Sequence, residues 1–252
     1  MIIDHPTTAQ IPQLRSLWKE AFGDTDAFLD IFFHRAFSPR RCCCVIQDDA
    51  VVAALYWFDC SWQDKRLAYL YAVATAKAYR GQGLCRALME KTHSLLRQYG
   101  YTGCILVPES EPLFTMYGKF GYRTCSCLQE FTCTAAEEPI PLTEATPDEY
   151  AAMRRRLLPH SSVLQEGVTL DFLSTYARLY TGPDLALAAY PDDGELVACE
   201  LLGAPQSAPR ILCALGFAQG TFRTPGRQRP FAMYLSLTED MAMPAYFGLA
   251  LN

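Results

Sequence analysis

The sequence predicts an α/β (α+β) protein whose mixed central sheet is flanked by helices and which continues into a second, shortened domain of the same kind. Two observations support this prediction. Stretches rich in β-branched and aromatic residues alternate with stretches of helical periodicity, and the order helix, helix, hairpin occurs twice, first near residue 11 and again near residue 147. Half of the 252 residues are apolar and the formal net charge is −5, as expected of a globular chain that can bury a full core.

Two helices and a run of strands open the chain. Apolar residues recur at helical spacing over 11–22, and Gly23-Asp24 ends that helix. Asp26 is expected to cap a second apolar helix, which Ser38-Pro39 stops. Three strands are predicted next, the first two joined as a hairpin by residues 47–50; they cover 42–46, 51–60 and 67–75.

The remainder of the first domain contains two further helices. One begins at about Leu84 and ends at Tyr99-Gly100, and a shorter one covers 111–120. A short buried strand at 104–107 separates them, and a long strand at 122–132 follows the second helix. With one more strand ahead of the first helix, the predicted order is β, α, α, β, β, β, α, β, α, β.

A stiff, charged segment at 137–141 (EEPIP) marks the predicted boundary between domains 1–135 and 136–252. Charge is distributed unevenly across it, since 1–135 carries 14 Lys and Arg against 13 Asp and Glu, whereas 136–252 carries 8 against 14. Beyond the boundary, helices are expected at 147–158 and 168–179, a hairpin at 185–190 and 195–202, and a closing strand at 231–237.

The stretch 71–89 (YAVATAKAYRGQGLCRALM) carries the chemistry. It is interpreted as a strand ending near Thr75, a loop with Arg80, Gly81, Gln82 and Gly83, and a helix that begins at Leu84. Glycine lets the backbone approach a ligand closely and adopt a positive φ, and the free N–H groups of the helix's first turn point at any negative group nearby. The pattern predicts an anion site that suits a phosphate.

Three other interpretations of the glycine loop can be compared by spacing. A Walker loop requires Gly-Lys-Ser/Thr, and Leu84-Cys85 follows the last glycine instead, which excludes a nucleotide triphosphatase. A dinucleotide fingerprint requires G-x-G-x-x-G directly after the strand, but residues 76–80 intervene and Arg86-Ala87 follows Cys85. The third interpretation, a tight strand-to-helix turn without a ligand, stays open on the loop alone.

Arg80, Gly83 and Cys85 fall in the frame Arg or Gln, two residues, Gly, one residue, Gly or Ala, with Cys85 as a small departure from it. Residues 116–122 (MYGKFGY) supply a second motif downstream. Together the two motifs resemble the GCN5-related N-acetyltransferase (GNAT) superfamily, and the resemblance covers about residues 1–133. One long terminal strand is visible where that family has two, so the other is expected to be shortened or contributed by residues further along the chain.

The resemblance implies direct transfer of an acetyl group from acetyl-CoA to a primary amine of a small molecule or peptide. It places Tyr117 as the general acid that protonates the leaving thiolate. The alternative is a non-catalytic acyl-CoA-binding or sensing protein. The expected cofactor-binding residues are the strand end and the loop with the helix start, namely Val73, Ala74, Thr75, Arg80, Gly81, Gln82, Gly83, Leu84, Cys85 and Arg86.

The general base is left open by the sequence. Asp59, Glu109, Glu111, the C-terminal carboxylate of Asn252 and a water chain are the candidates. The second half has no counterpart of the Arg80–Gly83 loop, so the chain resembles tandem acetyltransferases of the enhanced-intracellular-survival type with a degenerate second domain. That domain is expected to shape the acceptor cleft.

The eleven cysteines are expected to be small buried hydrophobic residues rather than metal ligands or disulfides. Cys42, Cys43 and Cys44 alternate along a strand and cannot share one tetrahedral site, and no second pair or His completes a zinc set with Cys125 and Cys127. Without a dense basic run, a signal peptide or a long apolar segment, neither nucleic acid nor membrane is expected as a partner, and the expected location is the cytosol.

Overall fold

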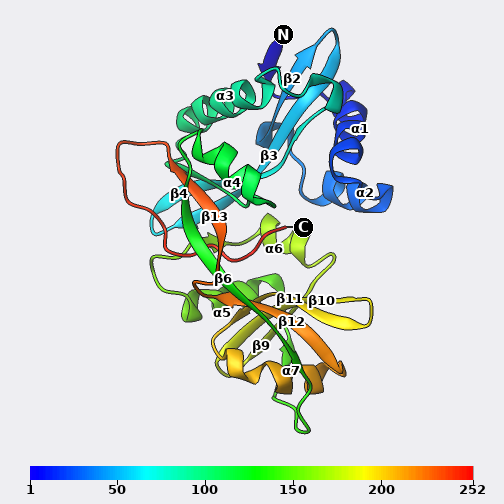
Figure 1. Cartoon of the computed structure of the whole chain (residues 1–252), viewed down its shortest axis with the longest axis vertical. Coiled ribbons are helices and arrows are strands. Elements are labelled where there is room, and N and C mark those ends of the chain that lie inside the picture. Colours follow the sequence, from blue (N-terminus) through cyan, green and yellow to red (C-terminus); the bar gives the residue numbers. More distant parts are fainter. Residues whose placement is uncertain (252) are drawn as a thin grey trace.

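The computed structural model describes residues 1–251, and within them thirteen strands form one mixed sheet that runs through both halves of the chain. Figure 1 shows the N-terminal half at the top, the C-terminal half below it, and the long strand β6 (Arg123–Thr134) passing from one to the other. This confirms the predicted fold class, a mixed sheet flanked by helices. The strand order is β1-β2-β3-β4-β5-β13-β6-β12-β11-β10-β9-β7, with β8 paired to β3.

In the N-terminal half, helices cover both faces of the sheet. One buried cluster joins the first two helices to Cys42 and Cys44, and the other joins the next two helices to Cys43, so adjacent cysteines do point to opposite faces. The elements are β1 (Ile2–Asp4), α1 (Ile11–Phe22), α2 (Asp26–Arg35), β2 (Cys42–Gln47), β3 (Ala50–Trp62), β4 (Lys65–Thr75), α3 (Leu84–Gln98), β5 (Gly103–Leu106) and α4 (Glu111–Gly118).

Local chemistry explains where these elements begin and end. Gly23, with φ 78°, ends α1, and the Asp48-Asp49 pair supplies the two positive φ values of the β2–β3 hairpin turn. The expectation that Asp26 caps α2 is wrong by one residue. The cap is Thr25, whose hydroxyl accepts from the N–H of Phe28, while Asp26 lies in the first turn and pairs with Lys19.

The C-terminal half repeats the hairpin pattern with one helix shorter than predicted. The helix expected over 168–179 ends at Leu173, because the residues from Arg178 onward pair with β10 as a strand. A helix over 208–215 and a strand over 219–225 had not been predicted. The elements are β7 (Thr143–Glu144), α5 (Pro147–Leu157), β8 (Leu164–Gln165), α6 (Val168–Leu173), β9 (Arg178–Gly182), β10 (Leu185–Asp192), β11 (Glu195–Leu202), α7 (Ala208–Leu215) and β12 (Gln219–Pro225).

The two halves exchange their last strands. β6 (Arg123–Thr134) pairs with β12 of the second half, and β13 (Arg229–Ser236), distant in sequence, lies between β5 and β6. The terminal strand expected to be missing from the first half is thus contributed by the second half, and the predicted closing strand is confirmed as β13. The division at 135/136 stays a prediction, since the sheet continues across it.

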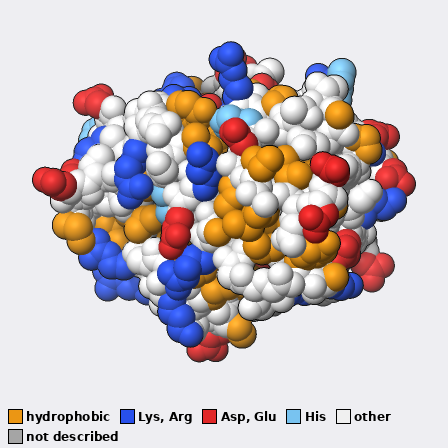
Figure 2. Space-filling model, turned by 90° about the horizontal axis from the view of Figure 1, so that it is seen from above, with side chains coloured by type: hydrophobic (Ala, Val, Ile, Leu, Met, Phe, Trp, Pro, Cys, Tyr) orange, Lys and Arg blue, Asp and Glu red, His pale blue; other side chains and the backbone are white. Residues whose placement is uncertain are grey.

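The surface of the N-terminal half mixes charges of both signs. Figure 2, which looks down on this half, shows basic and acidic side chains interspersed around apolar ones. No helix within 1–251 is long and apolar enough to cross a membrane. All eleven cysteines are free thiols, and no group of three or more metal-ligating side chains occurs in the same range.

Candidate active site

The strands β4 and β5 separate where the candidate site begins. They pair in parallel only from Leu67–Gly103 to Tyr69–Ile105, after which β5 ends and β4 continues to Thr75. Beyond that point β4 carries one extra residue relative to β3. Ala74 pairs with Ala54 and Tyr71 with Tyr56, so three steps along β4 correspond to two steps along β3. Ala72 has a φ of 49° in this bulge. Bulges leave backbone groups unpaired and redirect them, which places polar backbone atoms at the opening between the strands.

A cavity of about 460 Å³ occupies this opening. Its wall combines the β4 bulge with residues of α1, α4 and the final segment of the chain. The lining residues used below are Asp24, Tyr69, Ala72, Val73, Glu109, Tyr117 and Leu251. We refer to it as the Tyr117 cavity.

The glycine loop opens into a second cavity, of about 730 Å³, which we call the loop cavity. Gly81 and Gly83 have φ values of 76° and 78°, so side chains would be strained there, and a Cβ built on either would project into open space. The first intrahelical bond of α3 runs from the N–H of Ala87 to the carbonyl of Gly83, which leaves the N–H groups of 84–86 free. These features fit a pyrophosphate, as an anion would meet backbone donors with no side chain between.

Most of the predicted cofactor residues lie around these two cavities. Val73 lines the Tyr117 cavity, whereas Ala74 is buried in β4 and Gln82 turns its amide towards the carbonyl of Ala78. The side chain of Arg80 donates to the carbonyl of Thr75 at 3.1 Å. The predicted cofactor residues that line the loop cavity are Thr75, Arg80, Gly81, Gly83, Leu84, Cys85 and Arg86.

The two cavities are neighbours, because Glu109 and Leu113 line both. On the loop side, the guanidinium of Arg86 lies over the ring of Phe120 at 4.6 Å from its centroid. That contact orients a cation at the mouth of the loop cavity, where it adds to the positive field of the helix N-terminus.

Tyr117 lies on α4 with its side chain almost fully buried against the Tyr117 cavity. Burial, together with the nearby Cys85 thiol, raises the pKa of Tyr117 above that of an ordinary tyrosine. Within residues 1–251 its hydroxyl has no hydrogen-bond partner, so the proton is free for a ligand. Burial also raises the pKa of the Cys85 thiol, which stays protonated at neutral pH and is a poor nucleophile.

The candidate bases lie at different places relative to the two cavities. Asp59 lies outside the cavities in a cluster with Arg41, Arg66 and Tyr101, whose hydrogen bonds hold its pKa low despite burial. Glu109 is exposed and lines both the Tyr117 cavity and the loop cavity. Glu111 lines a third cavity on the other side of α4, and Asn252 lies outside the described residues.

Asp24 lines the Tyr117 cavity and was missed as a site residue. The sequence shows it only as part of the turn that ends α1, which is a structural signal. Its carboxylate accepts from the indole N–H of Trp18 at 2.7 Å, and Trp18 is packed against Tyr71 of β4. This contact holds one carboxylate oxygen in place beside the cavity.

Residues 245–251 cross from the second half to the Tyr117 cavity, where the C-terminal end lies between the two halves in Figure 1. The side-chain amide of Gln165 donates to the carbonyl of Leu249 and accepts from the backbone N–H of the same residue. Ser126 donates to the carbonyl of Phe247.

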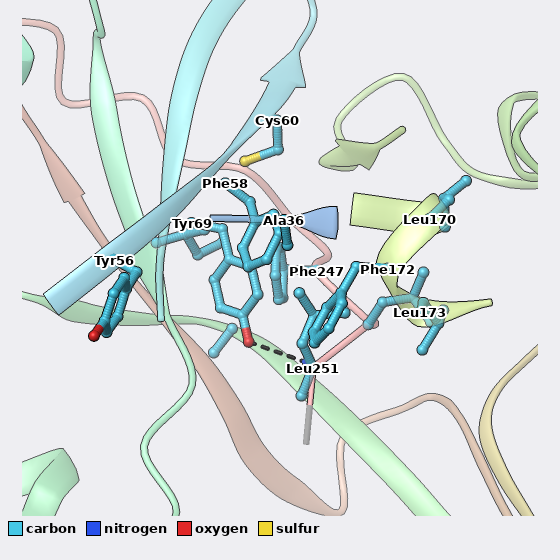
Figure 3. Packing of buried hydrophobic residues seen from close by; sticks show 14 of the residues in the cluster. Ala36, Tyr56, Phe58, Cys60, Tyr69, Leu170, Phe172, Leu173, Phe247 and Leu251 are labelled. Atoms are coloured by element: carbon cyan, nitrogen blue, oxygen red, sulfur yellow. Dashed lines mark hydrogen bonds between the residues drawn. The ribbon is translucent and has the colours of Figure 1, made fainter. Parts of the chain in front are cut away.

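The two ends of the segment are held by tyrosines. Tyr246 donates to the buried Glu200, which is also paired with Arg154. The N–H of Leu251 then reaches the Tyr69 hydroxyl, as Figure 3 shows.

Apolar packing fixes the same segment. Figure 3 shows Phe172 and Leu173 of α6 facing Phe58 and Phe247 in one buried cluster. The ring centroids of Tyr69 and Phe247 are 4.9 Å apart. Because the segment is buried on both sides, its position is set by the two halves together.

Residues 3–125 match the family model described as an acetyltransferase (GNAT) domain. No curated protein matches the chain. Among solved structures, the chain is similar to a GCN5-related N-acetyltransferase from Kribbella flavida, with 18% identity, a TM-score of 0.71, and coverage of 94% of this chain and 72% of that one.

Two further structures cover the chain to the same extent. A GCN5-related N-acetyltransferase from Anabaena variabilis has 15% identity and a TM-score of 0.72, and the match covers 94% of this chain and 73% of that one. Eis1 from Mycobacterium abscessus has 13% identity and a TM-score of 0.70, and the match covers 94% of this chain and 74% of Eis1. At these identities the likeness establishes the fold. The chain therefore has the GNAT fold, and its residues 3–125 match the model of the GNAT acetyltransferase domain.

Proposed function

We propose that this protein is an N-acetyltransferase that moves the acetyl group of acetyl-CoA directly to a primary amine. The observation that carries the proposal is the adjacency of the loop cavity and the Tyr117 cavity, which share Glu109 and Leu113. The first offers backbone donors for a pyrophosphate, and the second offers a protonated phenol and carboxylates at the point where two strands separate. The cytosol is the compartment in which we expect it to act.

Different residues would bind different parts of the cofactor. The amides of 81–85 would hold the pyrophosphate, with Arg80 and Arg86 adding charge-assisted contacts. The pantetheine arm would follow Val73, Ala74 and Thr75 along β4. This arrangement delivers the thioester to the Tyr117 cavity.

Transfer requires three functions from the protein. Backbone groups at the β4 bulge would stabilise the oxyanion that forms when the amine nitrogen attacks the thioester carbonyl. When the carbon–sulfur bond breaks, Tyr117 would give its proton to the leaving sulfur. The proton lost by the amine would pass to Asp24 or Glu109, directly or through water. Cys85 is not needed as a carrier, since its thiol stays protonated.

We also propose a tandem architecture of the enhanced-intracellular-survival type, with domains 1–135 and 136–252. In support, β11, α7 and β12 repeat the order of β4, α3 and β5, including the parallel pairing of the two strands. The loop into α7 lacks the glycine pattern, and Pro209 removes one backbone donor from the helix start. The second half would then shape the acceptor cleft through residues 245–251.

The alternative is a non-catalytic acyl-CoA-binding or sensing protein. One observation favours it, because β4 presents Tyr69 and Tyr71 to the cavity rather than a carboxylate. Turnover with a panel of primary amines separates the two. Binding of acetyl-CoA without any acetylated product would support the alternative.

The first test is the change in thermal unfolding on adding acetyl-CoA, with NAD and ATP as control ligands. At about 100 times its dissociation constant a ligand stabilises the folded state by about 2.7 kcal/mol. We expect a shift with acetyl-CoA that disappears in Gly83→Trp and persists in Gly100→Trp. Gly100 has the same left-handed φ at the other end of α3 and lines neither the loop cavity nor the Tyr117 cavity, so it controls for strain. The absence of any shift in the wild-type protein would refute the proposed function.

A further inference from the structure

A third cavity, of about 790 Å³, lies on the far side of α4 and is lined by both halves of the chain. It adjoins the Tyr117 cavity, since Val107, Pro108, Glu109 and Ala250 line both. A ligand whose amine lies beside Tyr117 can therefore extend into it. We call it the distal cavity.

Charge is arranged unevenly along the distal cavity. Glu109 lies in the part shared with the Tyr117 cavity, whereas Glu111 at the start of α4, Arg223 of β12 and Arg229 of β13 line the distal cavity but not the Tyr117 cavity. Apolar side chains form much of the remaining wall, among them Phe114, Phe231 and Met233. The distal cavity thus has two carboxylates, Glu109 and Glu111, from the first half and two arginines, Arg223 and Arg229, from the second half.

The two arginines carry more charge than their partner neutralises. Both donate to the same oxygen, Oε2 of Glu130, at 2.8 Å, and their hydrogen bonds hold the pKa of that carboxyl below its usual value. Glu130 therefore stays ionised and fixes both guanidinium groups, yet one positive charge is left over. The remaining guanidinium N–H groups of Arg223 and Arg229 have no hydrogen-bond partner within residues 1–251.

We propose that the distal cavity binds the remote end of the acceptor and that Arg223 and Arg229 select acceptors carrying a carboxylate there. The inference rests on the proposed function and names its substrate class: a primary amine joined by a partly apolar body to an anionic end. A guanidinium presents paired N–H donors that match a carboxylate. Glu109, at the shared part, would disfavour an anion close to the amine, which fixes the orientation.

The test uses peptides of two to four residues, each with a free N-terminal amine and supplied both with a free C-terminal carboxylate and as the C-terminal amide. Acetylation kinetics are measured for each member of every pair. We expect a carboxylate preference of about tenfold in kcat/KM for at least one length, the size of one charge-assisted hydrogen bond. The preference should fall with added salt, because the contact is partly exposed.

Variants assign the preference to these side chains. Arg229→Gln and Arg223→Gln should each lower kcat/KM for the carboxylate peptide more than for its amide, and so reduce the preference for the carboxylate. Arg227→Gln is the matched control, since Arg227 is an exposed arginine beside Arg229 that lines none of the three cavities. An unchanged thermal shift with acetyl-CoA checks that each variant is folded and binds the cofactor.

The outcomes distinguish this inference from the proposed function. Equal use of carboxylate and amide at every length, or a preference that survives both glutamine substitutions, would overturn the inference and leave the acetyltransferase intact. Acetylation of simple alkylamines but of no peptide carboxylate would do the same. If no primary amine is acetylated, the proposed function fails and the inference fails with it.

Discussion

The backbone N–H of Leu251 donates to the phenolic oxygen of Tyr69 at 3.3 Å, across 182 positions of sequence (Figure 3). Tyr69 is the last β4 residue that pairs with β5 before the two strands separate. Both residues line the Tyr117 cavity. One wall of the candidate acceptor site is therefore supplied by residues remote from the glycine loop in sequence.

Tyr69→Phe removes this hydrogen bond and leaves a buried N–H without its partner. We expect a loss of about 1 kcal/mol in the free energy of unfolding. Because Leu251 would be held less firmly, KM for the amine should rise severalfold while KM for acetyl-CoA stays constant. Steady-state kinetics with each substrate varied in turn measure this, and parallel changes in both KM values would contradict it.

Tyr117→Phe should lower kcat by about 10²-fold, because the leaving sulfur loses its proton donor. Binding of acetyl-CoA, measured by the thermal shift, should stay near the wild-type value. Tyr180→Phe, on β9 of the second half, is the control and should leave kcat unchanged. Full turnover by the Tyr117 variant would remove this residue from the mechanism.

Asp24→Asn keeps an acceptor for the indole N–H of Trp18 and removes the charge beside the cavity. If Asp24 receives the proton of the amine, kcat/KM for the amine should fall by about tenfold or more, with KM for acetyl-CoA unaffected. Asp26→Asn is the matched control, because Asp26 is exposed, pairs with Lys19 and lines no part of the cavity. Wild-type kinetics in Asp24→Asn would leave Glu109 or water as the base.

Glu200→Leu should destabilise the protein by about 3–5 kcal/mol, since it leaves the guanidinium of Arg154 buried without its charge partner. The double variant Arg154→Met with Glu200→Leu should recover part of that loss, because no unpaired charge remains. Denaturant unfolding of the wild type, both single variants and the double variant measures the coupling. If the loss of stability in the double variant equals the sum of the losses in the two single variants, Arg154 and Glu200 have no interaction energy and the prediction is wrong.

Because of His93, we expect the free energy of unfolding to depend on pH. Burial, and to a lesser degree Arg97, lowers the pKa of His93 to about 4, whereas an exposed histidine titrates near 6.5. Between these values the unfolded chain binds a proton that the folded chain does not, so stability is full above pH 6.5 and is lost as the pH falls towards 4. The loss attributable to this residue is about 3 kcal/mol.

His93→Gln tests this dependence. The amide can still hydrogen-bond the Tyr122 hydroxyl, which His93 contacts at 2.8 Å, but it does not titrate. Unfolding free energies of wild type and variant, measured at about pH 7 and about pH 4.5, should show a smaller advantage of the wild type at the lower pH. A constant difference between the two proteins would refute the prediction.

Local signals in the sequence predicted most elements of the first half and the glycine loop. Turn and cap chemistry act over a few residues, so Gly23, Asp48 and Gly83 could be assigned a role before any contact was known. The shorter α6 is an instructive failure. Residues 174–179 carry a helical pattern, but pairing with β10 stabilises a strand from Arg178 onward, and such pairing is invisible in a local window.

By itself the sequence determined the fold class, the glycine loop before α3 and the position of Tyr117 on a helix, because each depends on residues that are close together in the chain. Tertiary structure alone decided that β13 lies between β5 and β6, that Asp24 and Leu251 meet at the Tyr117 cavity, and that Arg223 and Arg229 share Glu130. These relationships join segments that are far apart in the chain, as the 182 positions between Tyr69 and Leu251 illustrate. They arise from strand pairing and burial across the whole chain, which no local spacing of residues encodes.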